Sequence, residues 1–362
     1  MANKLEQSRK SINEIDSQMA QLFLQRMRLA ETVFEYKKEF GLPILDKKRE
    51  SIVIEKNSAM IEDEVIRNYY IDFLKNLMSL SRAYQYRMQN GLSVAYSGIP
   101  GAFAHIAAGR IFPGSNKVSY HDFKSAYDSV VNGESDVAVL PIENSYAGEV
   151  GKTVDLIFSG GLYINGIYEL EIHQNLLALP DATIEDVKKV ISHSQALDQC
   201  GEYIALRGFD TEESTNTAVA AKAVADMGDK SFAAIASLET AEIYGLKVLA
   251  ANINKSGENT TRFAVVSKVR ANSPSLSNSV LMFTVKHEAG SLANAISIIG
   301  KYGYNMTTLR SRPLKNHSWQ YYFYIEIDGT TETEEGRKML CELDSVCDRL
   351  KVAGTFAPHI AI

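Results

Sequence analysis

Residues 5–38 read LEQSRKSINEIDSQMAQLFLQRMRLAETVFEYKK, and this stretch decides how the chain begins to fold. Apolar residues recur in it every seven positions, in two rows on one helical face: Leu5, Ile12, Met19 and Val33, and beside them Ile15, Leu22, Leu29 and Tyr36. Arg26 occupies the remaining position of the first row, and Arg9 and Lys37 flank the same face. Because unpaired cations are costly to bury, the stretch predicts a long helix that helps to bind a small polyanion.

The spacing of these cations decides which of them can share a ligand. Arg9 and Lys37 would lie about 42 Å apart along one helix, whereas Arg26 and Lys37 would be separated by roughly 16 Å, which their long side chains can bridge. Arg9 can reach the same ligand only from an antiparallel partner helix. We therefore predict an intertwined homodimer, or a larger homo-oligomer, in which Arg9 crosses the interface. The alternative is that all three cations lie at the edge of an ordinary coiled coil.

The composition of the 362-residue chain is that of an ordinary globular protein, with 45% hydrophobic and 23% charged residues, and the length allows two or three domains. A formal charge of −6 argues against a general nucleic-acid partner. No apolar run is long enough to cross a bilayer, and the first residues, MANKLEQSRK, lack the apolar core of a signal peptide. We expect no membrane partner and a cytoplasmic location.

The cysteines and histidines show no metal-binding pattern. Cys200, Cys341 and Cys347 are too few and too scattered for a disulfide framework or a paired zinc motif, and the seven histidines form no HExxH-type pair. We expect structural thiols and a chemistry that needs neither a metal nor another cofactor.

The pattern of the whole chain predicts three domains. Residues 1–90 predict three helices, the first broken by Gly41 and Pro43, the second beginning at Asp46 and the third spanning roughly 62–88. Residues 91–270 predict an α/β domain, in which short strand-like runs at 92–98, 136–143, 189–194 and 232–237 are separated by helical stretches such as 217–228. After a polar linker at 271–278, residues 279–362 predict the order βαββαβ of a ferredoxin-like α+β domain.

Four stretches of the first domain, LEQSRKSINEID, LQRMRLAETVFEYKK, LDKKRE and SRAYQ, resemble the all-helical chorismate mutases over residues 5–88. The resemblance implies that Arg26 and Arg9 of the partner subunit hold the two substrate carboxylates, while Lys37 and Gln85 face the ether oxygen. It implies that Glu50 lies at the substrate hydroxyl. It also implies that Asp46, Arg49 and Ser81 complete the pocket. Such a site suits a pericyclic rearrangement, which needs a compact conformer and donors aimed at developing charge.

In the central domain, small polar residues precede several predicted helices. Gly98 and Gly101 precede AFAHIAAG, Ser192 precedes a helix that contains Gln195, and Ser214 and Thr215 precede the helix at 217–228. Helix N-termini bind carboxylates, so these positions predict a site for an anionic substrate. The alternative is local structure, because Ser192 with Gln195 fits a capping box and Asn144-Ser145 fits a turn.

Four ordered motifs of this domain, LPIENSYAGEV, VISHSQALDQC, ESTNTAVAAKA and NTTRFAVVSK, resemble the prephenate dehydratases over residues 92–270. The resemblance implies an α/β fold of two subdomains, like that of periplasmic binding proteins. It implies that Thr261 lies at the leaving hydroxyl with Arg262 beside it as a carboxylate partner, and Glu143 is a second candidate acid. It also implicates Asn144, Ser192 and Gln199 in catalysis, and Ser214 and Thr215 in substrate binding. His173 and His193 titrate near neutrality, although a histidine beside a strand is more often structural.

The C-terminal stretches EAGSLANAI, YGYNMTTLRSRPLK and WQYYFYIEI resemble the ACT-type amino-acid-binding domains that follow prephenate dehydratases. The resemblance implies an effector site, with phenylalanine as the effector, at Gly290, Ser291, Leu292, Asn305, Ser311, Arg312 and Pro313. The chain departs from the common pattern twice. It has Gly-Ser-Leu where Gly-Ala-Leu is common, and Arg310 stands where these domains commonly have glutamate, which reverses a charge.

Together these motifs predict a bifunctional enzyme that rearranges chorismate to prephenate and then converts prephenate to phenylpyruvate, with feedback by phenylalanine. Two alternatives remain open. One is a dehydratase that acts on arogenate, the amino analogue of prephenate, with the helical domain serving mainly for dimerisation. The other is a non-catalytic sensor whose α/β domain closes on a small molecule.

Overall fold

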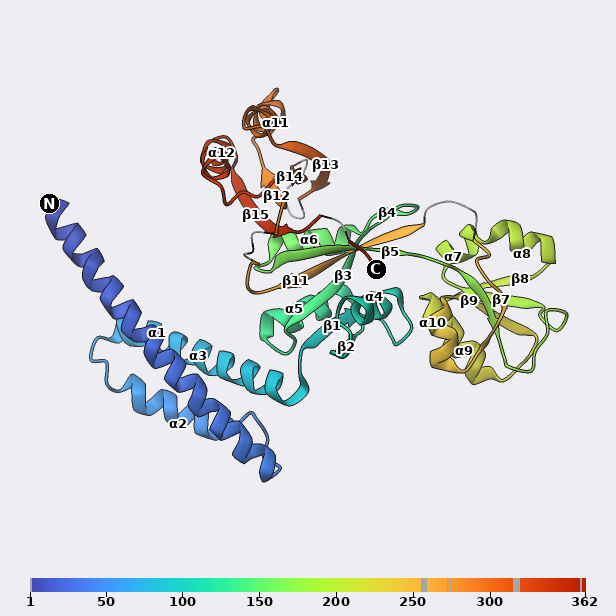
Figure 1. Ribbon diagram of the computed structural model, residues 1–362, viewed down its shortest axis with the longest axis horizontal. Coiled ribbons are helices and arrows are strands. Elements are labelled where there is room, and N and C mark those ends of the chain that lie inside the picture. Colours follow the sequence, from blue (N-terminus) through green and yellow to red (C-terminus); the bar gives the residue numbers. More distant parts are fainter. Residues whose placement is uncertain (1, 255–258, 272, 274, 315–319, 359) are drawn as a thin grey trace. The chain divides into compact units, whose positions relative to one another are not determined.

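A computed structural model describes residues 2–254, 259–271, 273, 275–314, 320–358 and 360–362 (Figure 1). Residues 272 and 274 of the predicted linker, and Lys315 and Trp319 of two quoted stretches, lie outside the described residues. The contacts divide the chain into a helical unit, residues 1–92, and a second unit, residues 93–362.

The helical unit consists of the three predicted helices, α1 (Ala2–Glu39), α2 (Lys47–Ser58) and α3 (Glu64–Asn90). The side chains of Asp46 and Asp63 accept backbone N–H groups at the starts of α2 and α3, which explains where these helices begin. Both α1 and α2 pack on α3. The third helix begins and ends two residues later than the sequence pattern predicts.

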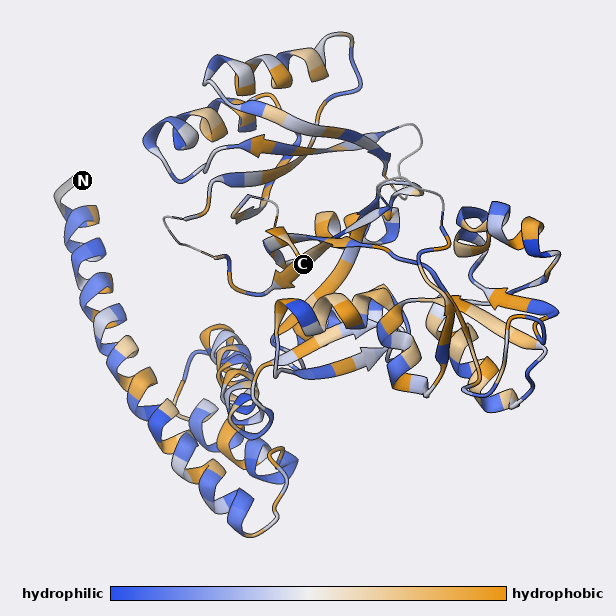
Figure 2. Cartoon of the chain, turned by 45° about the vertical axis from the view of Figure 1, so that its right-hand side comes forward, coloured by the Kyte–Doolittle hydropathy of each residue, from blue (hydrophilic) through white to orange (hydrophobic). Residues whose placement is uncertain are grey.

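The N-terminal half of α1 has no partner among the described residues. Every side chain from Lys4 to Gln25 is exposed, including Leu5 at 55% and Leu22 at 62%. Apolar residues recur along this half of the helix (Figure 2). In the C-terminal half of α1, Ala30 and Phe34 are buried. An exposed apolar stripe of this length is typical of a helix that packs against another chain.

The second unit begins with a lobe built on a mixed sheet. Its strands are β1 (Ser93–Ser97), β2 (Asn116–Tyr120), β3 (Val137–Asn144), β4 (Gly148–Glu149), β5 (Tyr163–Glu171) and β11 (Thr260–Ser267). β1 runs parallel to β2 and β3, whereas β11 lies between β3 and β5 and is antiparallel to both. The helices that pack on β1 and β3 are α4 (Phe103–Ile111), α5 (Phe123–Asn132) and α6 (Gly151–Ser159).

The second lobe is a separate five-stranded sheet in the order β10-β6-β9-β7-β8. Its strands are β6 (Asn175–Ala178), β7 (Lys189–Ser192), β8 (Asp210–Glu213), β9 (Phe232–Ala236) and β10 (Lys247–Ala250). Its helices are α7 (Ser194–Gln199), α8 (Gly201–Arg207), α9 (Thr217–Met227) and α10 (Leu238–Tyr244). The chain enters this lobe after β5 and leaves it before β11, so two crossings join the lobes. The predicted two-subdomain α/β fold is confirmed.

The C-terminal module has the predicted order βαββαβ. Its elements are β12 (Asn278–Thr284), α11 (Ser291–Lys301), β13 (Asn305–Pro313), β14 (Tyr321–Asp328), α12 (Glu334–Asp344) and β15 (Arg349–Phe356), followed by β16 (Ile360–Ala361). The strand order is β13-β14-β12-β15, with every neighbouring pair antiparallel.

The C-terminal module continues the sheet of the first lobe. Gly354 of β15 pairs with Ile164 of β5, and β16 also pairs with β5. A Cβ added at Gly354 would lie 2.0 Å from the Ile164 carbonyl oxygen, so only glycine allows the two strands to approach this closely. One hydrophobic core combines Leu140 and Ile157 of the lobe with Phe356 of the module.

Candidate active sites

In the helical unit, three predicted residues come together between α1 and α3. The Arg26 guanidinium donates a hydrogen bond to Ser81 Oγ, and Gln85 follows one turn later on the same face of α3. Gln85 is 6% exposed, and its Oε1 has no hydrogen-bond partner among the described residues. Burial lowers the pKa of the Arg26 guanidinium. A partly desolvated cation beside an unsatisfied amide is an arrangement that an anionic ligand would complete.

The predicted residues around α2 are already engaged within the chain. Lys37 Nζ donates to the Ile44 carbonyl oxygen at 2.5 Å, and Asp46 Oδ1 accepts the Arg49 backbone N–H at 2.9 Å as the N-cap of α2. Arg49 itself is exposed. Glu50 forms an ion pair with Arg82 of α3. Arg82 lies within the quoted stretch SRAYQ but was not among the predicted site residues.

Arg9 lies in the exposed half of α1, away from the pocket formed by Arg26 and Ser81. No hydrogen bond or ion pair joins its side chain to another described residue. The predicted contribution of Arg9 from a partner subunit stays a prediction.

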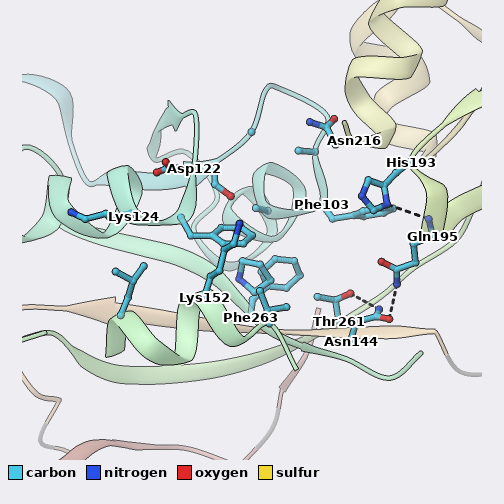
Figure 3. Close-up of a pocket in the computed structure, with 18 of the residues that line it drawn as sticks. Phe103, Asp122, Lys124, Asn144, Lys152, His193, Gln195, Asn216, Thr261 and Phe263 are labelled. Atoms are coloured by element: carbon cyan, nitrogen blue, oxygen red, sulfur yellow. Dashed lines mark hydrogen bonds between the residues drawn. The ribbon is translucent and has the colours of Figure 1, made fainter. Parts of the chain in front are cut away.

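In the second unit, a cavity of about 1000 Å³ is lined by both lobes and by part of the C-terminal module (Figure 3). The first lobe contributes Asn144 and Thr261, from the facing ends of β3 and β11, and the second lobe contributes Gln195, Gln199 and Thr215. The structure therefore brings together four residues that the sequence selected from four separate motifs: Asn144, Gln199, Thr215 and Thr261.

The side-chain amide of Asn144 organises this cavity. Its Nδ2 donates to Thr261 Oγ1 at 2.9 Å and to Asn259 Oδ1 at 2.9 Å, and its Oδ1 accepts Gln195 Nε2 at 3.0 Å. Backbone N–H groups at Tyr146 and Ala147 also donate to Oδ1, which fixes the orientation of the amide. Because the Thr261 oxygen accepts from Asn144, its own proton remains available to a ligand in the cavity.

Two further side-chain amides at buried positions of the lining each have one atom without a hydrogen-bond partner among the described residues. Gln199 is 5% exposed; its Oε1 accepts Asn259 Nδ2 at 2.9 Å, but its Nε2 has no partner among the described residues. Gln174 is 3% exposed, and its Oε1 is likewise unsatisfied. Since buried polar groups are nearly always hydrogen-bonded, these atoms indicate where a polar ligand or water binds.

Positive potential reaches the cavity from a helix N-terminus and from lysines. Gly98 and Gly101 precede α4, as expected from the sequence; they have φ of +100° and +89°, and no side chain caps the helix. Lys124 and Lys152 also line the cavity (Figure 3). Lys124 pairs with Asp128, whereas Lys152 makes no hydrogen bond or ion pair with a described residue. This lining favours an anionic ligand.

The capping-box alternative for Ser192 is wrong, and the N-cap of α9 lies after Ser214 and Thr215. His193, not Ser192, caps α7 by accepting the Gln195 N–H, and Asn216, not Ser214 or Thr215, caps α9. Ser192 ends β7, is fully buried and donates to the Ile235 carbonyl oxygen at 2.6 Å, while the Ser214 N–H donates to the Ser192 carbonyl. Neither of these serines lines the cavity.

Glu143 and Arg262 also lie outside the cavity lining, which corrects their predicted contact with substrate. Arg262 donates to Glu143 Oε2 at 3.0 Å and to Glu326 Oε2 at 2.8 Å. Burial would raise the pKa of the Glu143 carboxyl, but hydrogen bonds and charges from Arg310 and Arg262 outweigh burial and hold that pKa below its usual value. An ionised carboxylate held in this way is a poor proton donor. The physical reason is strand alternation, which turns these side chains away from the face that carries Asn144 and Thr261.

The histidines differ in position. His193 lines the cavity and uses Nδ1 to accept the Gln195 N–H at 3.3 Å. His173 is half-exposed and lies 3.4 Å from Glu171. Cys200 is buried, and burial raises the pKa of its thiol to about 12, as expected for an unreactive structural cysteine.

The predicted effector residues fall into two groups. Gly290, with φ of +86°, precedes α11, and Ser291 and Leu292 form its first turn. On β13, Asn305 donates to Asp328 at 2.9 Å and Ser311 is exposed. The other two β13 residues face the first lobe. Arg312 forms ion pairs with Glu149 and Asp155, and Pro313 lines the cavity.

Several lining residues were not selected from the sequence. Gln195, Asn216 and Asn259 lie inside the quoted motifs, so their amides could have been chosen with Asn144. Gln174 and Lys152 carry no comparable signal, because only the fold places them at the cavity.

No helix within the described ranges is long and apolar enough to span a membrane. In the same residues, histidines, cysteines and carboxylates form no cluster of three or more that could hold a metal ion.

Comparison with protein families gives two matches. Residues 8–86 match the family described as chorismate mutase type II, and residues 94–271 match prephenate dehydratase. A bifunctional chorismate mutase/prephenate dehydratase of Aquifex aeolicus is 31% identical, with 98% of each chain covered. An arogenate dehydratase/prephenate dehydratase of Arabidopsis thaliana is 32% identical over 73% of this chain and 72% of its own.

Two solved structures each resemble about three quarters of the chain. The prephenate dehydratase from Arthrobacter aurescens in complex with L-Phe is 26% identical, with a TM-score of 0.68, and the match covers 74% of this chain and 90% of that chain. A protein described as a novel type of quorum-quenching acylase is 29% identical, with a TM-score of 0.68, and covers 73% of this chain and 97% of its own. The near-complete match to the Aquifex protein extends through the helical part as well, and the chain belongs to the family of bifunctional chorismate mutase/prephenate dehydratases.

Proposed function

We propose that the chain catalyses two consecutive reactions, the rearrangement of chorismate to prephenate in the helical unit and the conversion of prephenate to phenylpyruvate in the cavity of the second unit. The observation that carries the second assignment is the Thr261 hydroxyl, which lines the cavity and accepts a hydrogen bond from Asn144, so that its own proton is free to be donated to a ligand. Prephenate, with two carboxylates and a hydroxyl leaving group, has the chemistry that this lining complements.

The dehydratase step consumes one proton and yields phenylpyruvate, carbon dioxide and water. The bond to the ring carboxylate breaks, its electron pair enters the ring, and the bond to the ring hydroxyl breaks as that group leaves. Thr261 donates a hydrogen bond to the departing oxygen, and Asn144 fixes its direction. A neutral threonine is a weak acid, so the proton that completes water comes through the surrounding network.

Substrate orientation follows from the rest of the lining. The uncapped N-terminus of α4 and Thr215 at the start of α9 provide donors for carboxylates. The unsatisfied Gln199 Nε2 offers a further donor on the second lobe. The substrate then bridges the two lobes and excludes water while it reacts.

The mutase step needs no proton transfer, so its residues bind and orient the substrate. Arg26 and Arg9 of the partner subunit hold the carboxylates, while Lys37 and Gln85 donate to the ether oxygen as charge develops on it. In this assignment Asp46, Arg49, Glu50 and Ser81 shape the pocket. The exposed apolar stripe of α1 supports a homodimer in which two such helices pair.

Mixing two inactive variants tests this shared mutase site. Arg9→Ala and Arg26→Ala each remove one arginine from both sites of a homodimer. A mixed dimer has one site that lacks both arginines and one that keeps both, so random exchange should restore about a quarter of the parental mutase rate. The control is each variant exchanged with itself. No recovery in a mixture shown to contain mixed dimers would contradict the crossing of Arg9.

We also propose that the C-terminal module is an ACT-type domain that binds phenylalanine. Its strand order and the turn at Gly290 before α11 support this, and the related Arthrobacter protein carries L-Phe. Calorimetry with phenylalanine, together with dehydratase rates, tests it. We expect binding heat and a change in rate, whereas neither at millimolar phenylalanine would contradict an effector role.

The choice between prephenate and arogenate is tested by assaying both substrates. The match to the Aquifex protein over 98% of each chain supports prephenate, because that protein is named as a prephenate dehydratase. We expect a higher kcat/KM for prephenate. A higher value for arogenate would contradict this substrate assignment, and stoichiometric binding of either without turnover would indicate a sensor.

A further inference from the structure

A cluster of charges joins the C-terminal module to the two strands that carry Asn144 and Thr261. In the register of β3 and β11, Thr261 pairs with Asn144, and Arg262 pairs with Glu143. Successive side chains of a strand point to opposite faces. The amide and hydroxyl therefore face the cavity, while the charged pair on the same backbone faces the module.

The contacts of this cluster hold Glu143 between two guanidinium groups. Arg262 donates to Glu143 Oε2 at 3.0 Å, and Arg310 of β13 forms an ion pair with the other oxygen, Oε1. Arg262 also donates at 2.8 Å to Glu326 of β14, which is 1% exposed and accepts the Tyr324 hydroxyl at 2.7 Å. All four charged groups are thus fixed by directional contacts.

The charge balance of the cluster explains the arginine at position 310. Arg262 faces Glu143 and Glu326, and Glu169 lies 3.9 Å away. Arg310 supplies the second cation and also lies 3.9 Å from Glu149. The glutamate that is common here in ACT-type domains would add another carboxylate beside Glu143, which a partly buried site disfavours.

We propose that Arg310 is a positioning residue for the dehydratase reaction: acting through Glu143, it fixes the end of β3 and thereby the Asn144–Thr261 pair. This inference rests on the proposed function of that pair. Misplacement of a reacting group by about 1 Å can cost on the order of 100-fold in rate. The C-terminal module thus contributes to the geometry of the cavity without an effector.

The test compares Arg310→Gln with a matched interdomain control, Arg270→Gln. Arg270 is 26% exposed and Arg310 is 20% exposed. Arg270 also binds the C-terminal module, pairing with Glu332 at 2.9 Å and donating to Thr355 at 2.7 Å, but it contacts no residue of the Glu143 cluster. Both variants are made in the full chain and assayed with prephenate. Mutase turnover checks the concentration of the chain, and urea unfolding checks that the second unit is folded.

We expect Arg310→Gln to lower dehydratase kcat by at least ~10-fold while KM changes by less than about 2-fold. Arg270→Gln should stay within about 2-fold of the parent, and Arg310→Lys should recover most of the lost rate because it keeps the charge. If Arg310 acts through Glu143, the double variant Arg310→Gln/Glu143→Gln should be no slower than the slower single variant.

Parental activity in Arg310→Gln, an equal loss in Arg270→Gln, or losses that multiply in the double variant would each overturn the proposal. If Arg310→Gln does not fold, the dehydratase kcat of Arg310→Lys is compared with that of Glu143→Gln. Equal kcat values in these two variants would contradict the proposal. Thr261→Val in the same assay tests the Asn144–Thr261 pair separately from Arg310. Full activity there refutes the proposed role of the pair, whatever Arg310 does.

Discussion

Whether a side chain of β3 or β11 reaches the cavity is decided by the face of the strand that it occupies. Thr261 and Arg262 are adjacent in one motif, yet only Thr261 lines the cavity. The same alternation separates Asn144 from Glu143. Strand alternation alone could have shown that neighbours in an extended motif cannot both contact one substrate.

Replacement of Thr261 by valine tests the central residue of the cavity. Valine keeps the β-branched shape but removes the hydroxyl that donates to the leaving group. We expect at least ~100-fold loss of dehydratase kcat, the scale for one lost transition-state donor, with unchanged mutase turnover. Thr260→Val is the control, since the neighbouring threonine enters the network through its backbone. Equal rates in the two variants would contradict the assignment.

Lys37 carries the corresponding prediction for the helical unit. Its ammonium group is held at 2.5 Å from the Ile44 carbonyl oxygen, and in the proposed site it would donate to the ether oxygen. Lys37→Ala should lower the mutase rate by at least ~100-fold and leave prephenate turnover intact. The control is Lys38→Ala, at the neighbouring lysine, which should keep the parental mutase rate. A parental rate in Lys37→Ala would refute the role.

The sequence identified most of the residues in the cavity network because they lie in compact motifs, but it did not locate the helix caps. The resemblance selected Ser192 for catalysis, and the alternative was a capping box with Gln195. In the structure β7 extends through that position and turns its hydroxyl inward, so His193 takes the cap. Where a strand ends is decided by pairing with β8 and β9, which a local motif does not specify.

At the scale of elements, the predicted strands and helices are confirmed wherever the pattern was strong, as in β1, β3, β9, α9 and the whole βαββαβ order. The helix predicted from Ser192 onward is split, because Cys200 leaves helical geometry with φ −102° and ψ 8° and α8 begins at Gly201. The local hydrophobic pattern does not predict which strands pair when they lie far apart in the sequence. The insertion of β11 between β3 and β5 joins strands far apart in the chain.

The contact between β15 and β5 gives a prediction at this scale. Gly354→Ala would place a methyl group against the Ile164 carbonyl oxygen and force the two strands apart. We expect a loss of about 1–3 kcal/mol in the stability of the second unit, the usual cost of overpacking. Gly161→Ala is the matched control, because a Cβ at Gly161 meets nothing within 4 Å. Urea unfolding followed by circular dichroism measures both. Equal midpoints in the two variants would contradict the close approach.

At the scale of the whole molecule, the charged cluster makes the second unit sensitive to acid. The pKa of Glu143 is lowered in the folded state from its usual 4.5, so the unfolded chain binds more protons there. Stability contributed by this group is therefore present above pH 4.5 and lost as the pH falls through the folded pKa. Arg310→Gln should show a smaller drop in unfolding midpoint between pH 6 and pH 4 than the parent. The Arg270→Gln control should keep the parental drop, and an unchanged drop in Arg310→Gln would exclude this origin of acid sensitivity.

The order of the two units along one chain matches the order of the two reactions, since the product of the first site is the substrate of the second. The measurement that tests this most directly is a time course of the purified chain with chorismate alone, following chorismate, prephenate and phenylpyruvate by chromatography. We predict that prephenate rises first and that phenylpyruvate then accumulates as chorismate is consumed. Chorismate that remains unchanged, together with prephenate that remains unchanged when it is supplied instead, would contradict both activities.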